Sequence, residues 1–198
     1  QIHALTADDN SAIPSIYAND QIVVFSTATG SIVAINPAAP VKIWQFDIIG
    51  KISAPMTQQN GWIYAAGDNA KIYKLNLRSG RPGWTLPFLT GAAPAGPPIV
   101  GEKMLYQPTA GQGLFAVDKE SGQNVWHLPK GKGLLTEKNG IAYALEKPAV
   151  LVAMDNQNGK KIYTVNFKPV TKYVSNVEEG IIYVSDESGK LAAITEKN

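Results

Sequence analysis

Residues 114–118, LFAVD, place Leu114, Ala116 and Asp118 on one side of a period-two pattern and Phe115 and Val117 on the other. This spacing is typical of a half-buried β-strand. Residues 125–128, VWHL, resume strand-forming residues after a turn at 121–122, where a glycine accepts the positive φ that tight hairpins use. The pattern therefore predicts a β-hairpin over residues 114–128.

The same hairpin recurs along the chain. One series of residues marks its second strand, one its third strand and one its fourth strand. Successive members are 40, 42, 37 and, where a fifth member exists, 40 residues apart in each series. Three series with one irregular spacing indicate a structural unit that is repeated five times. The series are Val24, Tyr64, Tyr106, Tyr143 and Tyr183; Ala34, Lys74, Ala116, Ala153 and Ala193; and Trp44, Trp84, Trp126 and Tyr163.

Each repeat also has a preceding apolar segment, so it holds four short strands in about 40 residues, the size of a propeller blade. We predict an all-β fold: a five-bladed β-propeller of four-stranded antiparallel blades, in one domain of residues 1–198. The blades span roughly 11–50, 51–91, 92–133, 134–170, and 171–198 with 1–10. The aromatic series is expected to pack between blades.

The last repeat stops before its fourth strand, and the N-terminal segment aligns with that strand, with His3 in the position of Trp44. We expect residues 1–10 to complete the last blade and to close the ring by hydrogen bonds, which would remove exposed sheet edges. The alternative is that the chain forms part of a larger ring.

Composition narrows the function classes. The apolar content of 44% and the charged content of 17% are those of a folded globular protein. A net charge of +2 with scattered basic residues argues against nucleic acid. The absence of cysteine excludes disulfides and thiolate catalysis. No apolar run is long enough to predict a transmembrane helix. Because the chain begins at Gln1 without an apolar leader, we expect that a targeting segment has been removed.

The hairpin sequence also resembles a known repeat. GLFAVDKESGQNVW (113–126) is similar to the PQQ-like β-propeller repeat, and VLVAMDNQNGKKIY (150–163) and KIYKLNLRSGRPGW (71–84) are weaker copies. This family includes quinoprotein dehydrogenases, which hold a quinone cofactor and calcium, and the propeller lipoprotein of the outer-membrane protein assembly machinery, a binding scaffold. The present sequence has fewer blades than the dehydrogenases and lacks a calcium-ligand cluster. The resemblance therefore implies a cell-envelope protein without a cofactor.

Candidate catalytic and metal-binding residues are few. His3 and His127 fall in outermost strands, and no third ligand accompanies them, so no metal site is predicted. Glycoside hydrolysis needs two carboxyl groups, but the first strands of the repeats carry no acid apart from Glu137. We therefore predict no catalytic residues and no enzymatic activity.

Loops between blades and loops between second and third strands are expected at one face of a propeller. This face is mildly basic, and we interpret it as a docking surface for an acidic or extended partner. The simpler interpretation is that these lysines keep the protein soluble. The predicted partner-binding residues are Lys51, Lys130, Lys132, Lys168, Lys172, Asp68, Asn69 and Gln112.

The first hypothesis is a non-enzymatic scaffold of the bacterial cell envelope, periplasmic or extracellular, that binds other envelope proteins as part of an assembly or secretion complex. The alternative is a small-ligand or carbohydrate-binding, lectin-like propeller, which would repeat the same polar and aromatic loop residues in every blade. The loops differ in length and chemistry, which favours the first hypothesis.

Overall fold

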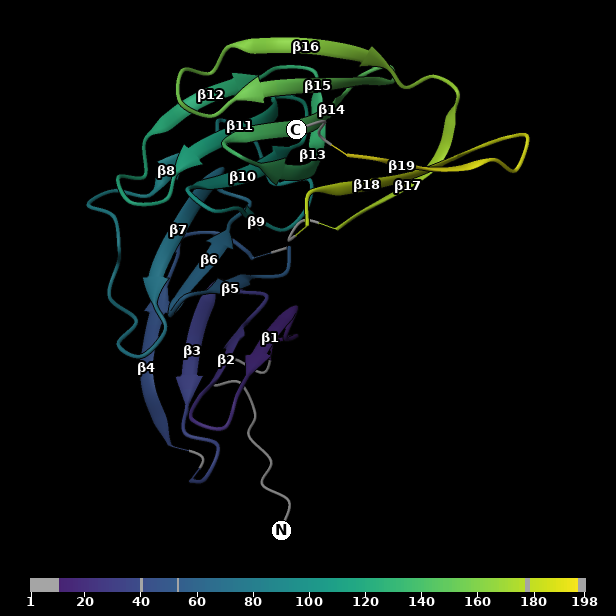
Figure 1. Cartoon of the computed structure of the whole chain (residues 1–198). Helices are drawn as coiled ribbons and strands as arrows, with labels where there is room; N and C mark the ends of the chain where they lie inside the picture. The colour runs from purple at the N-terminus through teal and green to yellow at the C-terminus, as the bar shows by residue number, and fades with distance from the viewer. Residues whose placement is uncertain (1–10, 40, 53, 177–178, 196–198) are drawn as a thin grey trace. The chain divides into compact units, whose positions relative to one another are not determined.

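The computed structural model describes residues 11–39, 41–52, 54–176 and 179–195. Within these ranges every regular element is a β-strand, and the strands form five antiparallel sheets, four of them with four strands (Figure 1). Within the described residues, the prediction of an all-β chain is confirmed, and that of four-stranded antiparallel repeats is confirmed for four of the five sheets. The chain divides into two compact units, Gln1–Pro98 with Glu120–Gly122, and Ile99–Lys119 with Gln123–Asn198.

The first unit contains two sheets, each with its strands in sequence order. One sheet consists of β1 (Ser15–Ala18), β2 (Val23–Ser26), β3 (Ser31–Ile35) and β4 (Lys42–Asp47). The other consists of β5 (Thr57–Gln59), β6 (Trp62–Ala66), β7 (Lys71–Asn76) and β8 (Phe88–Leu89).

The second unit contains three sheets, again with sequential neighbours. Their strands are β9 (Ile99–Val100), β10 (Met104–Thr109), β11 (Gly113–Asp118) and β12 (Asn124–Leu128); β13 (Gly131–Lys138), β14 (Ile141–Glu146), β15 (Val150–Asp155) and β16 (Lys161–Asn166); and β17 (Val170–Asn176), β18 (Ile181–Asp186) and β19 (Leu191–Ile194). β13 and β17 begin before the blade boundaries predicted at 134 and 171.

The residue series of the sequence lie directly opposite one another across the strands, with the exception of Trp84, which precedes the short fourth strand β8 and lies outside it. Val24 pairs with Ala34, and Ala34 pairs with Trp44. Cross-strand partners share one face of a sheet, so each small central residue leaves room beside it for the larger side chains. The repeat spacing therefore predicted the strand register. The equivalent partners are Tyr64–Lys74, Tyr106–Ala116–Trp126, Tyr143–Ala153–Tyr163 and Tyr183–Ala193.

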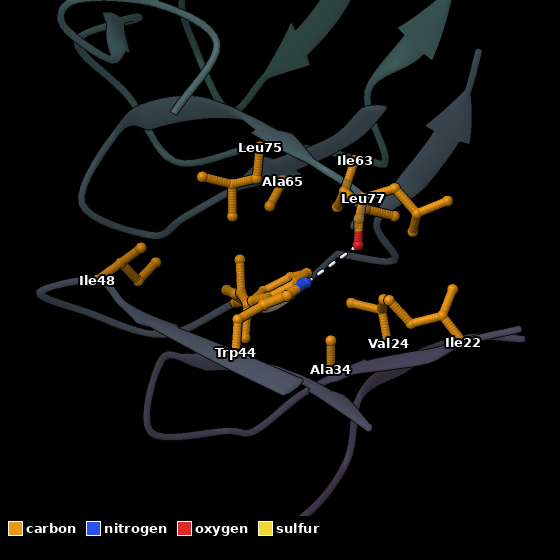
Figure 2. Packing of buried hydrophobic residues seen from close by; sticks show 11 residues of the cluster. Ile22, Val24, Ala34, Trp44, Ile48, Ile63, Ala65, Leu75 and Leu77 are labelled. Carbon is orange, nitrogen blue, oxygen red and sulfur yellow. Dashed lines mark hydrogen bonds between the residues drawn. The ribbon is translucent and has the colours of Figure 1, made fainter. Parts of the chain in front are cut away.

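Each tryptophan of the third series packs against the turn of the following repeat: Trp44 against Gly80, Trp84 against Gly122 and Trp126 against Gly159. Trp44 is 8% exposed, and its indole Nε1 donates a hydrogen bond of 3.0 Å to the carbonyl oxygen of Leu77 (Figure 2). The ring lies over Gly80, where an added Cβ would be 2.6 Å from the ring atoms. In the second unit, Trp126 lies against Gly159 through its Cβ, which would be 2.7 Å from a Cβ added at the glycine, and its indole Nε1 donates a hydrogen bond of 2.9 Å to Asn156 Oδ1.

Three apolar clusters form the cores of the units. Figure 2 shows the cluster of the first unit, in which side chains of β2, β3 and β4 face those of β6 and β7 around Trp44. Burying one side chain of this size contributes about 1.5–3 kcal/mol to folding. In the second unit one cluster surrounds Trp126, and another joins β13, β14 and β15 to β18.

The sheet β17–β18–β19 has three strands within the described residues. Several apolar side chains of β16 to β19 are exposed, including Tyr163 at 45% and Leu191 at 73%. The predicted fourth strand, residues 1–10 with His3, lies outside the described residues. Closure of the ring therefore stays a prediction.

The contact between Trp44 and Gly80 predicts a measurable loss of stability in Gly80→Ala. Gly80 has φ +68°, so alanine costs about 1–2 kcal/mol for the left-handed backbone alone. Overlap with the Trp44 ring adds about 1–3 kcal/mol. Urea denaturation monitored by tryptophan fluorescence measures the change.

Gly91→Ala is the matched control, because Gly91 has φ +75° and an added Cβ there meets no atom within 4 Å. We expect the free energy of unfolding of Gly91→Ala to fall only by the cost of placing alanine in a left-handed backbone conformation. Equal losses in the two variants would show that the indole does not need the glycine.

Candidate functional site

The predicted loops do meet at one end of the sheets. In three sheets, the first or second residue after the second strand donates a backbone hydrogen bond to a carbonyl of the loop that precedes the first strand. We call this end of each sheet the loop end. The bonds are Ala28 N to Ala12 O at 2.8 Å, Asp68 N to Lys51 O at 2.9 Å, and Lys147 N to Lys130 O at 2.9 Å.

The loop end of the first unit contains three of the predicted partner-binding residues. Asp68 Oδ1 accepts a hydrogen bond of 2.7 Å from the Lys51 N–H, and Asn69 Nδ2 donates to Ile49 O at 2.5 Å and to Tyr73 Oη at 2.9 Å. Asp68 and Asn69 therefore brace the two loops against each other. Lys51 is exposed beside them.

The long loop that follows β8 belongs to the same unit and is anchored at both ends. Thr90 Oγ1 donates to the carbonyls of Ala70 and Ala92 at 2.9 and 2.7 Å. At the other end, Thr57 Oγ1 donates 2.6 Å to Pro98 O. A proline-rich loop held in this way keeps a defined surface with little conformational entropy to lose on binding.

The loop end of the second unit gathers lysines. The bond between Lys147 and Lys130 joins two loops, and Lys132 Nζ lies 3.5 Å from Pro148 O. The next loop joins them because Phe167 N donates 2.9 Å to Ala149 O, which brings Lys168 to the same edge. We call these four exposed residues, Lys130, Lys132, Lys147 and Lys168, the lysine cluster.

Two of the predicted loop lysines lie in strands. Lys132 is the extra residue of a β-bulge in β13, where Gly131 pairs with Glu146 and Gly133 pairs with Leu145. Lys172 lies in β17 just after a similar bulge and remains exposed. A β-bulge adds one unpaired residue to a strand, and the strand continues beyond it. The sequence pattern did not indicate that these two lysines lie in strands. Sequence reasoning also left Lys147 out of the site.

Gln112 lies in the exposed turn between β10 and β11. Its carbonyl oxygen contacts His127 Nε2, and the His127 ring stacks on Phe115 with 4.1 Å between ring centroids and an angle of 7°. His127 therefore covers the surface of β11 from the edge strand β12, as predicted. No group of three or more His, Cys, Asp or Glu in the described part of the chain is placed to hold a metal ion.

Glu137, the one acid of the first strands, belongs to a hydrogen-bonded network in the second unit. Asn156 Nδ2 donates to Glu137 Oε1 at 2.9 Å and to Tyr106 Oη at 2.7 Å. The Glu102 N–H donates to Glu137 Oε2 at 3.1 Å. Since Trp126 binds the Oδ1 of the same asparagine, the network connects this tryptophan of β12 to β10, to β13 and to the turn that contains Glu102. This carboxylate is engaged in hydrogen bonds that hold strands together.

Burial changes the proton affinity of this network. It raises the pKa of the Glu137 carboxyl above its ordinary value of 4.5, although hydrogen bonds from the Glu102 N–H and from Tyr106 act in the opposite direction. Burial and the nearby Glu137 also raise the pKa of the Tyr106 hydroxyl.

With this geometry established, comparisons with known proteins identify the family. The family model described as "Outer membrane protein assembly factor BamB" matches residues 28–147. The chain belongs to the BamB family. No curated protein sequence matches it. This family assignment agrees with the envelope assembly role that the repeat resemblance implied.

Solved structures agree at the level of the fold. BamB from Moraxella catarrhalis has a TM-score of 0.56 and 14% identity, with 95% of this chain and 76% of that chain covered. The computationally designed Ika8 protein has a TM-score of 0.69 and 11% identity, covering 94% and 59%. The designed Ika4 protein has a TM-score of 0.61 and 13% identity, with 76% of this chain and 95% of that chain covered.

The described residues of this BamB family member contain no helix long and apolar enough to cross a membrane.

The raised pKa of Glu137 predicts a pH dependence of stability. Because the folded protein holds this proton more tightly than the unfolded chain, the stabilisation is complete below pH 4.5 and is lost as the pH rises through the folded pKa. The variant Glu137→Gln has no carboxyl group to titrate at this position, so its stability lacks this pH dependence. We expect the free energy of unfolding of the wild type to fall relative to that of Glu137→Gln between pH 4.5 and 7, measured by urea denaturation.

The control is Glu187→Gln, at an exposed glutamate in the turn after β18. Its stability should follow that of the wild type across the range. A constant difference between wild type and Glu137→Gln at every pH would contradict the prediction.

Proposed function

We propose that this protein is a non-enzymatic interaction scaffold of the bacterial cell envelope, on the periplasmic or extracellular side, within an assembly or secretion complex. Membership of the BamB family supports an envelope assembly role. The observation that carries the binding mode is the lysine cluster at the loop end of the second unit. Its partner is an acidic segment of another envelope protein.

The lysine cluster has the properties of a docking surface. Its four side chains are exposed, and within the described residues no carboxylate forms an ion pair with them. The neighbouring Glu146 is already paired with Lys161 at 3.1 Å. A group of unpaired cations on loops that are hydrogen-bonded to sheets attracts an acidic segment and fixes its orientation.

We predict that the double variant Lys130→Glu, Lys132→Glu loses its envelope partner. Reversing two charges should weaken an electrostatically steered contact by about tenfold at low salt, with less effect at high salt. Pull-down from envelope extract, with captured proteins identified by mass spectrometry and titrated at two salt concentrations, measures the loss.

The matched control is Lys103→Glu, Lys160→Glu. These lysines are exposed in turns at the opposite strand ends of the same unit, so the variant carries the same change of net charge. Equal loss of the partner in both variants would indicate only a net-charge effect. Retention of the wild type on a glycan array, with no protein captured, would favour the carbohydrate-binding alternative.

We also propose that the last blade is completed by residues 1–10, which would close the ring. The register of the other sheets places the fourth-strand aromatic opposite the central alanine, as Trp126 lies opposite Ala116. By the same register, His3 should lie opposite Ala193. Because the chain has no cysteine, a His3→Cys, Ala193→Cys pair is a clean probe.

We expect this pair to form an intramolecular disulfide under mild oxidation, seen as a mobility shift that a reductant reverses. The control pair Ile2→Cys, Ala193→Cys places one thiol on the other face of the predicted strand and should cross-link less. Failure of both pairs would favour the alternative of a larger ring.

A further inference from the structure

The first unit has a cleft of about 530 Å³ at the strand ends opposite its loop end. Three hairpin turns form its walls: those between β1 and β2, between β5 and β6, and after β7. Ile43 of β4 lines one side. This volume is in the range of small-molecule and peptide pockets, about 300–1,000 Å³.

Backbone hydrogen bonds fix the position of these turns. Leu77 N donates 2.8 Å to Gly61 O, which ties the turn after β7 to the turn between β5 and β6. The Leu77 carbonyl in turn accepts the indole N–H of Trp44, whose ring is buried in the core (Figure 2). The cleft is therefore preformed and does not need to be ordered when a ligand binds.

Some of the polar lining groups are already engaged. Asn19 Oδ1 accepts from the N–H groups of Gln21 and Ile22, each at 2.9 Å. Asn76 Oδ1 accepts from Arg78 N and Ser79 N at 3.1 and 3.0 Å. The side-chain oxygen of each asparagine therefore caps a turn and is not the main group that a ligand in the cleft would bind.

The available groups are cationic and amide groups. The Arg78 guanidinium is exposed, and its Nη2 lies 3.5 Å from Gln21 Oε1, a weak contact. The exposed amides of Gln21 and Asn60 lie beside it. Among the residues that the structure describes, Arg78 is the one charged residue of the lining, and no carboxylate lines the cleft with it. A guanidinium without an acidic partner matches the geometry of a carboxylate, which it binds with two parallel hydrogen bonds.

Apolar surface accompanies this charge. Ile43 is 48% exposed at the side of the cleft, and Ile22 and Leu77 contribute to its floor. A carboxylate with an adjacent apolar side chain and a peptide backbone would use the guanidinium, the isoleucine and the two amides together. An inorganic or very small anion would leave most of the cleft empty.

We propose that this cleft binds the C-terminal carboxylate of an extended peptide with apolar residues near its end. The carboxylate pairs with Arg78, the amides of Gln21 and Asn60 bind the peptide backbone, and the last side chain lies against Ile43. This site is separate from the lysine cluster and does not depend on the function proposed above.

The experiment uses the tetrapeptide acetyl-Ala-Leu-Ala-Val with a free carboxylate, the same peptide with a C-terminal amide, and sodium acetate. Each is titrated into the full chain at low salt, and the amide NMR shifts of Asn60, Gly61 and Leu77 report binding. We expect the acid to bind saturably and the amidated peptide to bind at least about tenfold more weakly.

Arg78→Gln tests the guanidinium, and Arg81→Gln is its matched control. Arg81 is exposed at the end of the same turn and does not line the cleft. We expect Arg78→Gln to bind the acid about tenfold more weakly and Arg81→Gln to bind it as the wild type does. Because the comparison of the acid and the amide needs only the wild type, a folding defect in a variant cannot hide the answer.

Three results would overturn the proposal. The first is that the acid gives no saturable shifts. The second is that the acid and the amide bind equally, or that Arg78→Gln binds the acid like the wild type. The third is that acetate binds as tightly as the tetrapeptide, which would show a general anion site and no peptide recognition.

Discussion

The packing of a fourth-strand tryptophan over the turn glycine of the next repeat is the contact on which the rest of the structure depends. Trp44 lies with its ring against Gly80 and Trp126 lies with its Cβ against Gly159, and in each case the indole N–H is satisfied by a buried acceptor three residues before that glycine. A larger residue at the glycine would meet the ring or its Cβ, and a smaller residue at the tryptophan would leave the acceptor unpaired. One contact therefore fixes both the spacing and the register of neighbouring repeats.

This packing also determines which parts of the chain remain for recognition. The faces of the sheets are used by the core clusters and by the tryptophan contacts, so the ends of the hairpins carry the variable chemistry. At the loop end of the second unit the hairpins carry lysines, and at the opposite strand ends of the first unit they enclose the cleft around Arg78. The two surfaces differ because their turns differ, although the strands beneath them follow the same pattern.

The sequence was sufficient to predict the repeated strands, and it predicted much less of the surfaces at the hairpin ends. The series through Val24, Ala34 and Trp44 predicted the strand register because cross-strand neighbours impose matching sizes. The series could not show that Lys132 sits in a bulge, since they mark the second, third and fourth strands and Lys132 lies in β13, a first strand. It also gave no signal for Asp68 and Asn69 as braces between loops, because these bonds depend on residues far away in sequence. Lys147 and Lys130 are joined by a backbone hydrogen bond although they are distant in the sequence. The spacing of residues in a single sequence does not reveal contacts of this kind.

Lys74 shows how a repeat absorbs a residue that its pattern does not favour. It occupies the position that alanine holds in the other repeats, yet its side chain is buried. Gly83 makes the space, because an added Cβ there would be 2.9 Å from the Lys74 chain, while the ammonium lies 4.5 Å from the centre of the Trp62 ring and 3.6 Å from Glu120. A buried charge is tolerated only when such partners surround it. The same holds for Glu137, which is held by Asn156 and a backbone N–H. Interior ionisable groups of this kind are engaged by neighbouring side chains and by the backbone, whereas Arg78 and the lysine cluster at the hairpin ends are exposed.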